Sequence, residues 1–191
     1  MIDQTLSFVV DELNRFLMAR FPDPDPLAVL SSLSAMDGAP LPGLDRKLIV
    51  TLVNLGKETA APALGLPTRT EDGTYARLAA PLHLNLYVMM SASFGNYQES
   101  LKMLSCVLGF FQARPVFDAQ SSVKFPLQLD RLACELVSIS TQELNNLWAI
   151  LGAKYLPSAL YKLRMVTLQQ NWLDAVVADV GQPDVRIGGQ S

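Results

Sequence analysis

The sequence predicts an α+β domain: one largely antiparallel or mixed sheet of about four to five strands, packed with about three helices. Apolar residues recur at helical spacing in some segments and at every second position in others, as in helices and strands that bury one side. Several strand-like segments also follow one another without a helix between them. With 191 residues, the chain is long enough for one domain. We expect this domain at residues 1–170, followed by a C-terminal tail at 171–191 that is a candidate docking arm.

The first predicted helix covers residues 3–20, because an apolar stripe runs along it. Its outer face is expected to carry Asp11, Glu12, Asn14 and Arg15. Three prolines in FPDPDP (21–26) end this helix. A short strand is expected at Ala28–Leu33. A stronger one follows at Lys47–Leu55, and its apolar residues on both faces predict a central place in the sheet.

Residues 56–80 are predicted to form a long loop, since prolines, glycines and polar residues dominate them. Loops of this length in a compact domain are often binding elements or disordered. Both charge signs and an aromatic ring occur here, which suits a contact with a neighbouring subunit or a tube; a solvated, poorly ordered loop is the alternative. The candidate interface residues in this segment are Glu58, Arg69, Glu71, Tyr75 and Arg77. Taken as the end of the preceding strand, Glu58 beside Lys57 is instead expected to be solvated.

The most apolar part of the chain is a strand, a turn and a helix at residues 81–117. Five strand residues alternate onto one predicted buried face: Leu82, Leu84, Leu86, Val88 and Met90. Asn96, after Gly95, is a candidate N-cap for the helix. A proline at position 115 is expected to end the helix at Arg114. The predicted buried stripe of the helix consists of Tyr97, Leu101, Leu104, Leu108 and Phe111, widened by Met103, Val107 and Phe110.

The last third of the chain predicts two strands and a third helix. Strands are expected at Leu132–Ile139 and Ala159–Leu168. Between them, Ser140 and Glu143 stand at capping-box spacing, and Gly152 is a candidate C-cap. The helix stripe comprises Leu144, Leu147, Trp148 and Leu151. The segment NWLDAVVADV at 171–180 suggests a short helix.

Trp172 is the second residue of that last segment. It is either an aromatic anchor against a partner or a cover over the domain's own sheet, and the second interpretation is slightly favoured.

Composition limits the classes of partner. Half of the residues are hydrophobic and only 17% are charged, against about 25% in typical soluble domains. Such a chain often buries part of its surface against partner subunits. The net charge of -3 gives no electrostatic reason to bind nucleic acid or an anionic membrane. We therefore expect no nucleic-acid partner, no membrane partner, and a protein made in the cytoplasm that stays soluble.

No arrangement of residues predicts catalysis or a cofactor. The single histidine, His83, lies in an alternating strand without a neighbouring cysteine or acidic residue. The spacings of metal sites, phosphate-binding loops, dinucleotide-binding loops and nucleophilic serines do not occur. The two cysteines, Cys106 and Cys134, are interpreted as small buried hydrophobes in a reducing compartment. The chain is therefore expected to be neither an enzyme nor a metal- or cofactor-binding protein.

Four long phrases in order resemble a known family over roughly residues 1–170. They are IDQTLSFVVDELNRFL, KLIVTLVNLGKETAA, APLHLNLYVMMSASFGNYQESLKMLSCVLGFFQARPVF and ELNNLWAILGAKYLPSALYKLRMVTLQ. The family is that of cap, or tube-terminator, proteins of extracellular contractile injection systems of the antifeeding-prophage and virulence-cassette type, which are similar to phage tail terminators.

This resemblance implies a structural protein with a tail-terminator-like fold. Relatives form a hexameric ring on the inner tube end distal to the baseplate, stop tube growth and hold the last sheath ring. The implied partners are further copies of the chain, an inner tube protein and a sheath protein, in a phage tail-like particle that can be released from the bacterium. Some relatives carry an extra domain after this region, where about 20 residues follow here. Two alternatives stay open: a baseplate or adaptor subunit of the same particle, or a small-molecule-binding domain.

Overall fold

The computed structural model describes residues 1–177 apart from 22, 36, 40, 59–66, 70–74, 79–81, 128 and 169–172. For residues 67–69, 75–78, 165–168 and 173–177 it describes the backbone alone.

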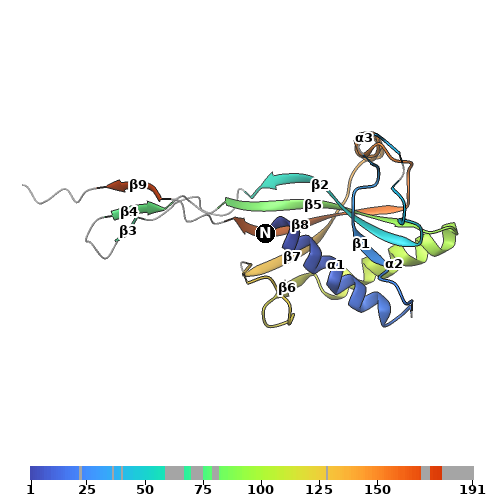
Figure 1. The fold of residues 1–191 in the computed structure, drawn as a ribbon, viewed down its shortest axis with the longest axis horizontal. Helices are drawn as coiled ribbons and strands as arrows, with labels where there is room; N and C mark the ends of the chain where they lie inside the picture. Colours follow the sequence, from blue (N-terminus) through green and yellow to red (C-terminus); the bar gives the residue numbers. More distant parts are fainter. Residues whose placement is uncertain are drawn as a thin grey trace, which may run out of the picture.

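Three helices and two sheets make up the described chain (Figure 1). The helices are α1 (Ile2–Met18), α2 (Tyr97–Ala113) and α3 (Thr141–Leu151). Six strands form the main sheet in the order β1 (Ala28–Leu30), β2 (Lys47–Lys57), β5 (Leu82–Ser93), β8 (Ser158–Leu168), β7 (Arg131–Val137) and β6 (Val116–Asp118). Three short strands form a second sheet in the order β3 (Pro67–Arg69), β4 (Tyr75–Leu78) and β9 (Leu173–Val177).

The predicted α+β class is confirmed, with a mixed main sheet of six strands rather than four to five. Only β1 and β2 run parallel, and every other neighbouring pair is antiparallel. β6 escaped prediction because a three-residue strand is too short to display an alternating pattern.

Two predictions for the less regular segments are wrong. Residues 56–80 are not one loop, because the end of β2 and all of β3 and β4 lie within them. The segment at 171–180 contains a strand, β9, instead of a helix. It pairs with β4 over Leu173–Val177. A helix of that length is marginal unless it packs, whereas the pair Val176–Val177 favours an extended backbone.

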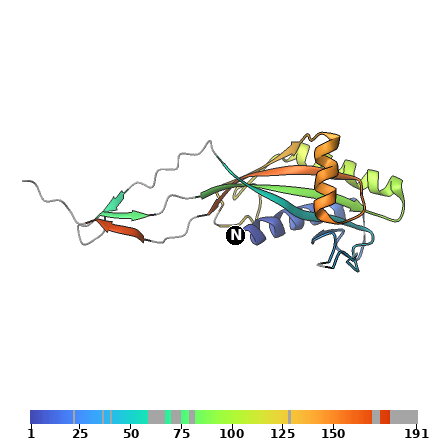
Figure 2. The same cartoon turned by 90° about the horizontal axis from the view of Figure 1, so that it is seen from above.

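Helices α1 and α2 cover one face of the main sheet, and α3 covers part of the other face (Figure 2). Alternate residues of β2 show this division: Leu48 and Val50 belong to the core beneath α1 and α2, while Ile49 packs with Trp148 of α3. The larger core is rich in phenylalanine. The ring of Phe8 meets those of Phe117 and Phe125 edge-on, at centroid distances of 5.7 and 5.3 Å, a favourable aromatic geometry.

The buried stripe of α2 differs from the predicted one. Its buried residues are Ser100, Met103, Val107, Phe110 and Phe111. Tyr97 and Leu101, which the prediction placed in the core, are exposed. The helix is apolar around much of its circumference, so helical spacing alone did not identify the side that meets the sheet. As a result, Tyr97 and Leu101 lie on the exposed side of α2.

The alternation of β5 is confirmed for four of its five predicted core residues, since Leu84, Leu86, Val88 and Met90 are buried while Leu82 is exposed. The strands on either side of β5 are irregular. The pairing of β2 with β5 shifts between Leu52 and Asn54, which leaves Val53 as a bulge. The pairing of β5 with β8 shifts between Leu84 and Leu86. Bulges of this kind bend a strand and increase its twist.

The predicted ends of α2 and α3 are confirmed, whereas α1 spans Ile2–Met18 and not the predicted 3–20. Asn96 Oδ1 accepts a hydrogen bond from the backbone N–H of Gln98 at 2.9 Å. Ser140 and Glu143 form the complete capping box, and Gly152 ends α3 with φ 62°. These contacts satisfy backbone groups that a helix leaves without partners at its ends.

Candidate interaction surfaces

A three-residue ion network lies on the face of the sheet that α3 leaves open. Arg164 of β8 donates to the Glu58 carboxylate from Nε and Nη2, at 3.2 and 3.1 Å. Its Nη1 donates to Glu135 of β7 at 3.1 Å. The two carboxylates raise the pKa of Arg164, with Glu135 the larger cause. The network ties the end of β2 to β8 and β7.

Glu58, a predicted interface residue, is therefore not solvated. Its side chain is 6% exposed, and its backbone N–H donates to the carbonyl of His83 at 2.8 Å. Because its partner Arg164 lies 106 residues away along the chain, no local pattern could reveal the pair.

Three other predicted interface residues lie together in the second sheet. Arg69 of β3 is directly opposite Tyr75 of β4, and Arg77 follows Tyr75 two positions later. Opposite residues and residues two apart share one face of a sheet. The backbone therefore places Arg69, Tyr75 and Arg77 on the same face, separate from Glu58. Trp172 and Glu71 lie outside the described residues.

A second charged cluster was not predicted. Glu12 was expected on the outer face of α1, but its side chain is only 2% exposed. It pairs with Arg15 on the same helix and with Arg114 at the end of α2, the latter at 3.6 Å. Both arginines are half-exposed. The cluster joins the two helices. The sequence around Glu12 did not indicate its pairing with Arg114.

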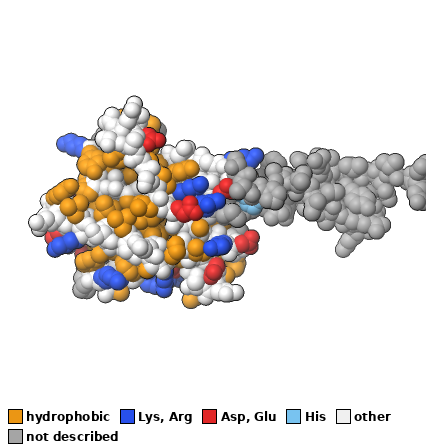
Figure 3. All heavy atoms as spheres, turned by 180° about the vertical axis from the view of Figure 1, so that it is seen from behind, with side chains coloured by type: hydrophobic (Ala, Val, Ile, Leu, Met, Phe, Trp, Pro, Cys, Tyr) orange, Lys and Arg blue, Asp and Glu red, His pale blue; other side chains and the backbone are white. Residues whose placement is uncertain are grey.

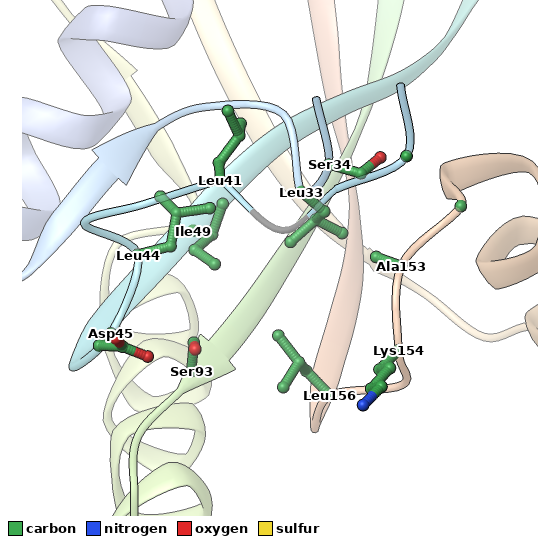
Figure 4. Close-up of a pocket in the computed structure, with 12 residues that line it drawn as sticks. Leu33, Ser34, Leu41, Leu44, Asp45, Ile49, Ser93, Ala153, Lys154 and Leu156 are labelled. Carbon is green, nitrogen blue, oxygen red and sulfur yellow. The ribbon is translucent and has the colours of Figure 1, made fainter. Parts of the chain in front are cut away.

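An apolar groove of about 490 Å³ lies beside α3, and we call it the α3 groove. Its apolar walls come from segment 33–49 on one side and segment 152–156 on the other (Figure 4). Asp45 and Lys154 add one charge of each sign to the lining. The groove offers no group of catalytic residues.

A second apolar groove, of about 380 Å³, lies between α2 and β7, and we call it the β7 groove. Burial raises the pKa of the Cys134 thiol to about 12 and is the main reason why the pKa of Tyr161 also reaches about 12. Both groups are therefore uncharged near neutral pH. The groove is lined by Leu108, Phe111, Gln112, Pro115, Cys134, Leu136 and Tyr161.

Figure 3 shows a broad area of apolar side chains on this face, with a cluster of acidic and basic side chains beside it and further charged side chains around the rim. Among the described residues, no three His, Cys, Asp or Glu side chains are grouped so that they could hold a metal ion. Within the same residues, no helix is both long and apolar enough to cross a bilayer. Cys134 is buried, as expected, whereas Cys106 is only partly buried.

The fold is similar to that of two solved structures of terminator proteins. One is the sheath/tube terminator of an extracellular contractile injection system, PVC, in its extended state, with TM-score 0.55 and 13% identity over 95% of this chain and 64% of that chain. The other is the tube-terminating cap of the anti-feeding prophage, with TM-score 0.53 and 13% identity over 94% of this chain and 60% of that one. The chain thus spans less than two thirds of either protein.

The sequence also matches the Pvc16 N-terminal domain family over residues 6–176. The chain belongs to this family, which confirms the resemblance seen in the sequence. No curated protein matches it.

Proposed function

We propose that this protein is a structural cap that forms a ring on the baseplate-distal end of a contractile injection system, ends its inner tube and holds the last sheath ring. The observation that carries this proposal is membership of the Pvc16 N-terminal domain family. The similarity in fold supports it, because it covers 95% of this chain and the solved structure is named a sheath/tube terminator.

The proposed partners are further copies of the chain in a hexameric ring, the inner tube protein and the sheath protein. The apolar β7 and α3 grooves and the low charge content fit a subunit that buries surface against other subunits. The role requires no nucleic acid, membrane, cofactor or catalytic group. The chain would be made in the bacterial cytoplasm and leave the cell only within the released particle.

Termination follows from geometry in this proposal. One surface of the ring matches the end of the tube, and the opposite surface carries no copy of the tube's own binding face. Growth therefore stops because the next tube subunit finds no complementary surface. A closed ring uses heterologous contacts, in which two different patches of each subunit meet.

The predicted interface residues belong to the same proposal. Arg69, Tyr75 and Arg77 share a face of the second sheet, and a row of two cations and a ring suits contact with an acidic tube or neighbouring subunit. Charge reversal with Arg69→Glu and Arg77→Glu should produce particles of irregular length. Normal particles would remove these residues from the interface without removing the cap role.

The decisive measurement is particle length by electron microscopy in a producing strain that lacks this gene. Overlong, irregular or absent sheathed particles are expected, with normal length restored by the gene supplied in trans. Uniform particles of normal length would refute the terminator role. Abnormal baseplates on tubes of normal length would instead identify a baseplate or adaptor subunit.

A further inference from the structure

Both edges of the main sheet are paired over only part of their length. β1 pairs with β2 over Leu48–Val50, and β6 pairs with β7 over Arg131–Ala133. Beyond these contacts, β2 from Leu52 to Lys57 and β7 from Leu136 to Val137 each have one strand neighbour among the described residues. The two open stretches lie on opposite edges of the sheet (Figure 1). An open strand edge is a template for pairing with another chain.

Leu55 faces outward at the β2 edge. The backbone N–H of Glu58 donates to His83 of β5, so residue 58 faces inward, and alternation turns residues 57 and 55 outward. The N–H of Leu55 donates to Oδ1 of the exposed Asn54 at 2.8 Å. A side-chain amide thus occupies the position where a neighbouring strand would place its carbonyl.

Leu136 faces outward at the β7 edge. The N–H of Cys134 donates to the carbonyl of Pro115 at 2.8 Å, so Cys134 faces outward, and so does Leu136 two residues later. The Leu136 side chain is 57% exposed and lines the β7 groove. An open backbone edge and an apolar groove therefore adjoin each other, a combination that suits an added strand with an apolar side chain.

The two edges are complementary in face and direction. Leu55 is opposite Leu86, and Leu136 is opposite Tyr161. Leu86 and Tyr161 both belong to the core beneath α1 and α2, so both exposed leucines lie on that face of the sheet. β2, β5, β8 and β7 alternate in direction. β7 of one copy would therefore run antiparallel to β2 of the next, as in the rest of the sheet.

We propose that two copies of this chain join edge to edge, with Leu52–Lys57 of one copy along the Leu136 edge of its neighbour. The side chain of Leu55, which is 45% exposed, then enters the neighbour's β7 groove. A second copy is the occupant because one chain carries both halves of the contact in matching polarity. The contact rests on the proposed cap function only where it is taken as the joint between the subunits of the ring. Because the two patches differ, the contact is heterologous and can close a ring.

Site-specific cross-linking tests this contact. The variant carries Leu55→Cys and Leu136→Cys in a chain whose native thiols are removed by Cys106→Ser and Cys134→Ala. A short bis-maleimide should link successive subunits into a ladder of multimers, both in isolated particles and in the purified chain at high concentration. Either single-cysteine variant should stay monomeric on a denaturing gel. No ladder in either sample, or equal linking by a single-cysteine variant, would overturn the proposal.

Substitution with lysine gives a second test, in which association of the subunits is measured in particles and in the purified chain. Leu55→Lys and Leu136→Lys should each abolish subunit association, whereas Ile150→Lys should not, because Ile150 is equally apolar but lies on α3 and is 81% exposed. Melting curves would check that all three variants fold. If only Leu136→Lys abolished association, the β7 groove would hold a segment of the neighbouring copy other than the Leu55 edge, and the proposed pairing would be overturned. Normal-length particles in the gene-deletion strain would refute the proposed cap role. The edge-to-edge contact would still be tested separately, by cross-linking of the purified chain.

Discussion

The two faces of the main sheet are built differently. On the α1 and α2 side, one continuous core extends from Leu6 to Leu163 and includes five stacked or edge-on phenylalanines. On the α3 side, a small cluster around Trp148 covers one end, and the other end carries the ion network of Glu58, Arg164 and Glu135. The comparison teaches that the packing that stabilises the fold lies mainly on the first face, while much of the second face carries no apolar cluster among the described residues.

The largest loss of stability is expected from the first face. Phe117→Ala removes a fully buried ring that contacts Phe8 and Phe110. It should cost about 3–5 kcal/mol of unfolding free energy, because such truncations lose burial and leave a cavity. Denaturant unfolding would measure the loss. Leu127→Ala, at a fully exposed position, is the control and should leave the unfolding midpoint unchanged. If Phe117→Ala lost less unfolding free energy than Trp148→Ala, the α3 side and not the first face would contribute more to stability.

A smaller effect is expected in the ion network. Arg164→Met keeps the aliphatic part of the side chain but leaves the buried Glu58 carboxylate without its guanidinium. The melting temperature at neutral pH should fall by several degrees. Glu135→Gln breaks the half-exposed partner of the same arginine and should have almost no effect. Equal losses from the two variants would mean that burial of Glu58 does not decide the strength of the network.

The smallest effect is expected at the α3 cluster. The indole Nε1 of Trp148 is buried and has no hydrogen-bond partner among the described residues, and its ring contacts Tyr155 at a centroid distance of 5.4 Å. Trp148→Phe keeps an aromatic ring and removes the unpaired donor. The two effects should nearly cancel, within about 1 kcal/mol. A loss as large as that of Trp148→Ala would show that the indole itself is required.

Local signals predicted local structure well. Asn96, Ser140, Glu143 and Gly152 were assigned as caps from their spacing alone, and each forms the expected contact or conformation. Caps are set by residues within one helical turn, so the sequence contains all that is needed. The class of fold followed in the same way from the two periodicities.

Signals that depend on distant residues were not predictable. Buried Glu12 pairs with Arg114 as well as with the nearby Arg15, and buried Glu58 pairs with Arg164. Arg114 and Arg164 lie far from these carboxylates in the sequence. The side of α2 that meets the sheet could not be chosen, because two adjacent rows of that helix are apolar. Each groove is likewise lined by segments that are distant in the sequence: α2 and β7 in one, segments 33–49 and 152–156 in the other. The resemblance to the family, and not these patterns, is what led to the proposed function.

The bulge at Val53 changes which residues of β2 face the helices: even-numbered residues before it and odd-numbered residues after it. Before the bulge, Leu48 and Val50 point to the face covered by α1 and α2. Without the bulge, alternation would place Asn54 on that face after residue 53; with it, Leu55 lies there. A one-residue insertion thus sets which side chain the open edge presents. Substitutions after Val53 would change the edge without altering the core half of the strand. The two halves of β2 can therefore be changed separately, the first acting on the core and the second on the edge.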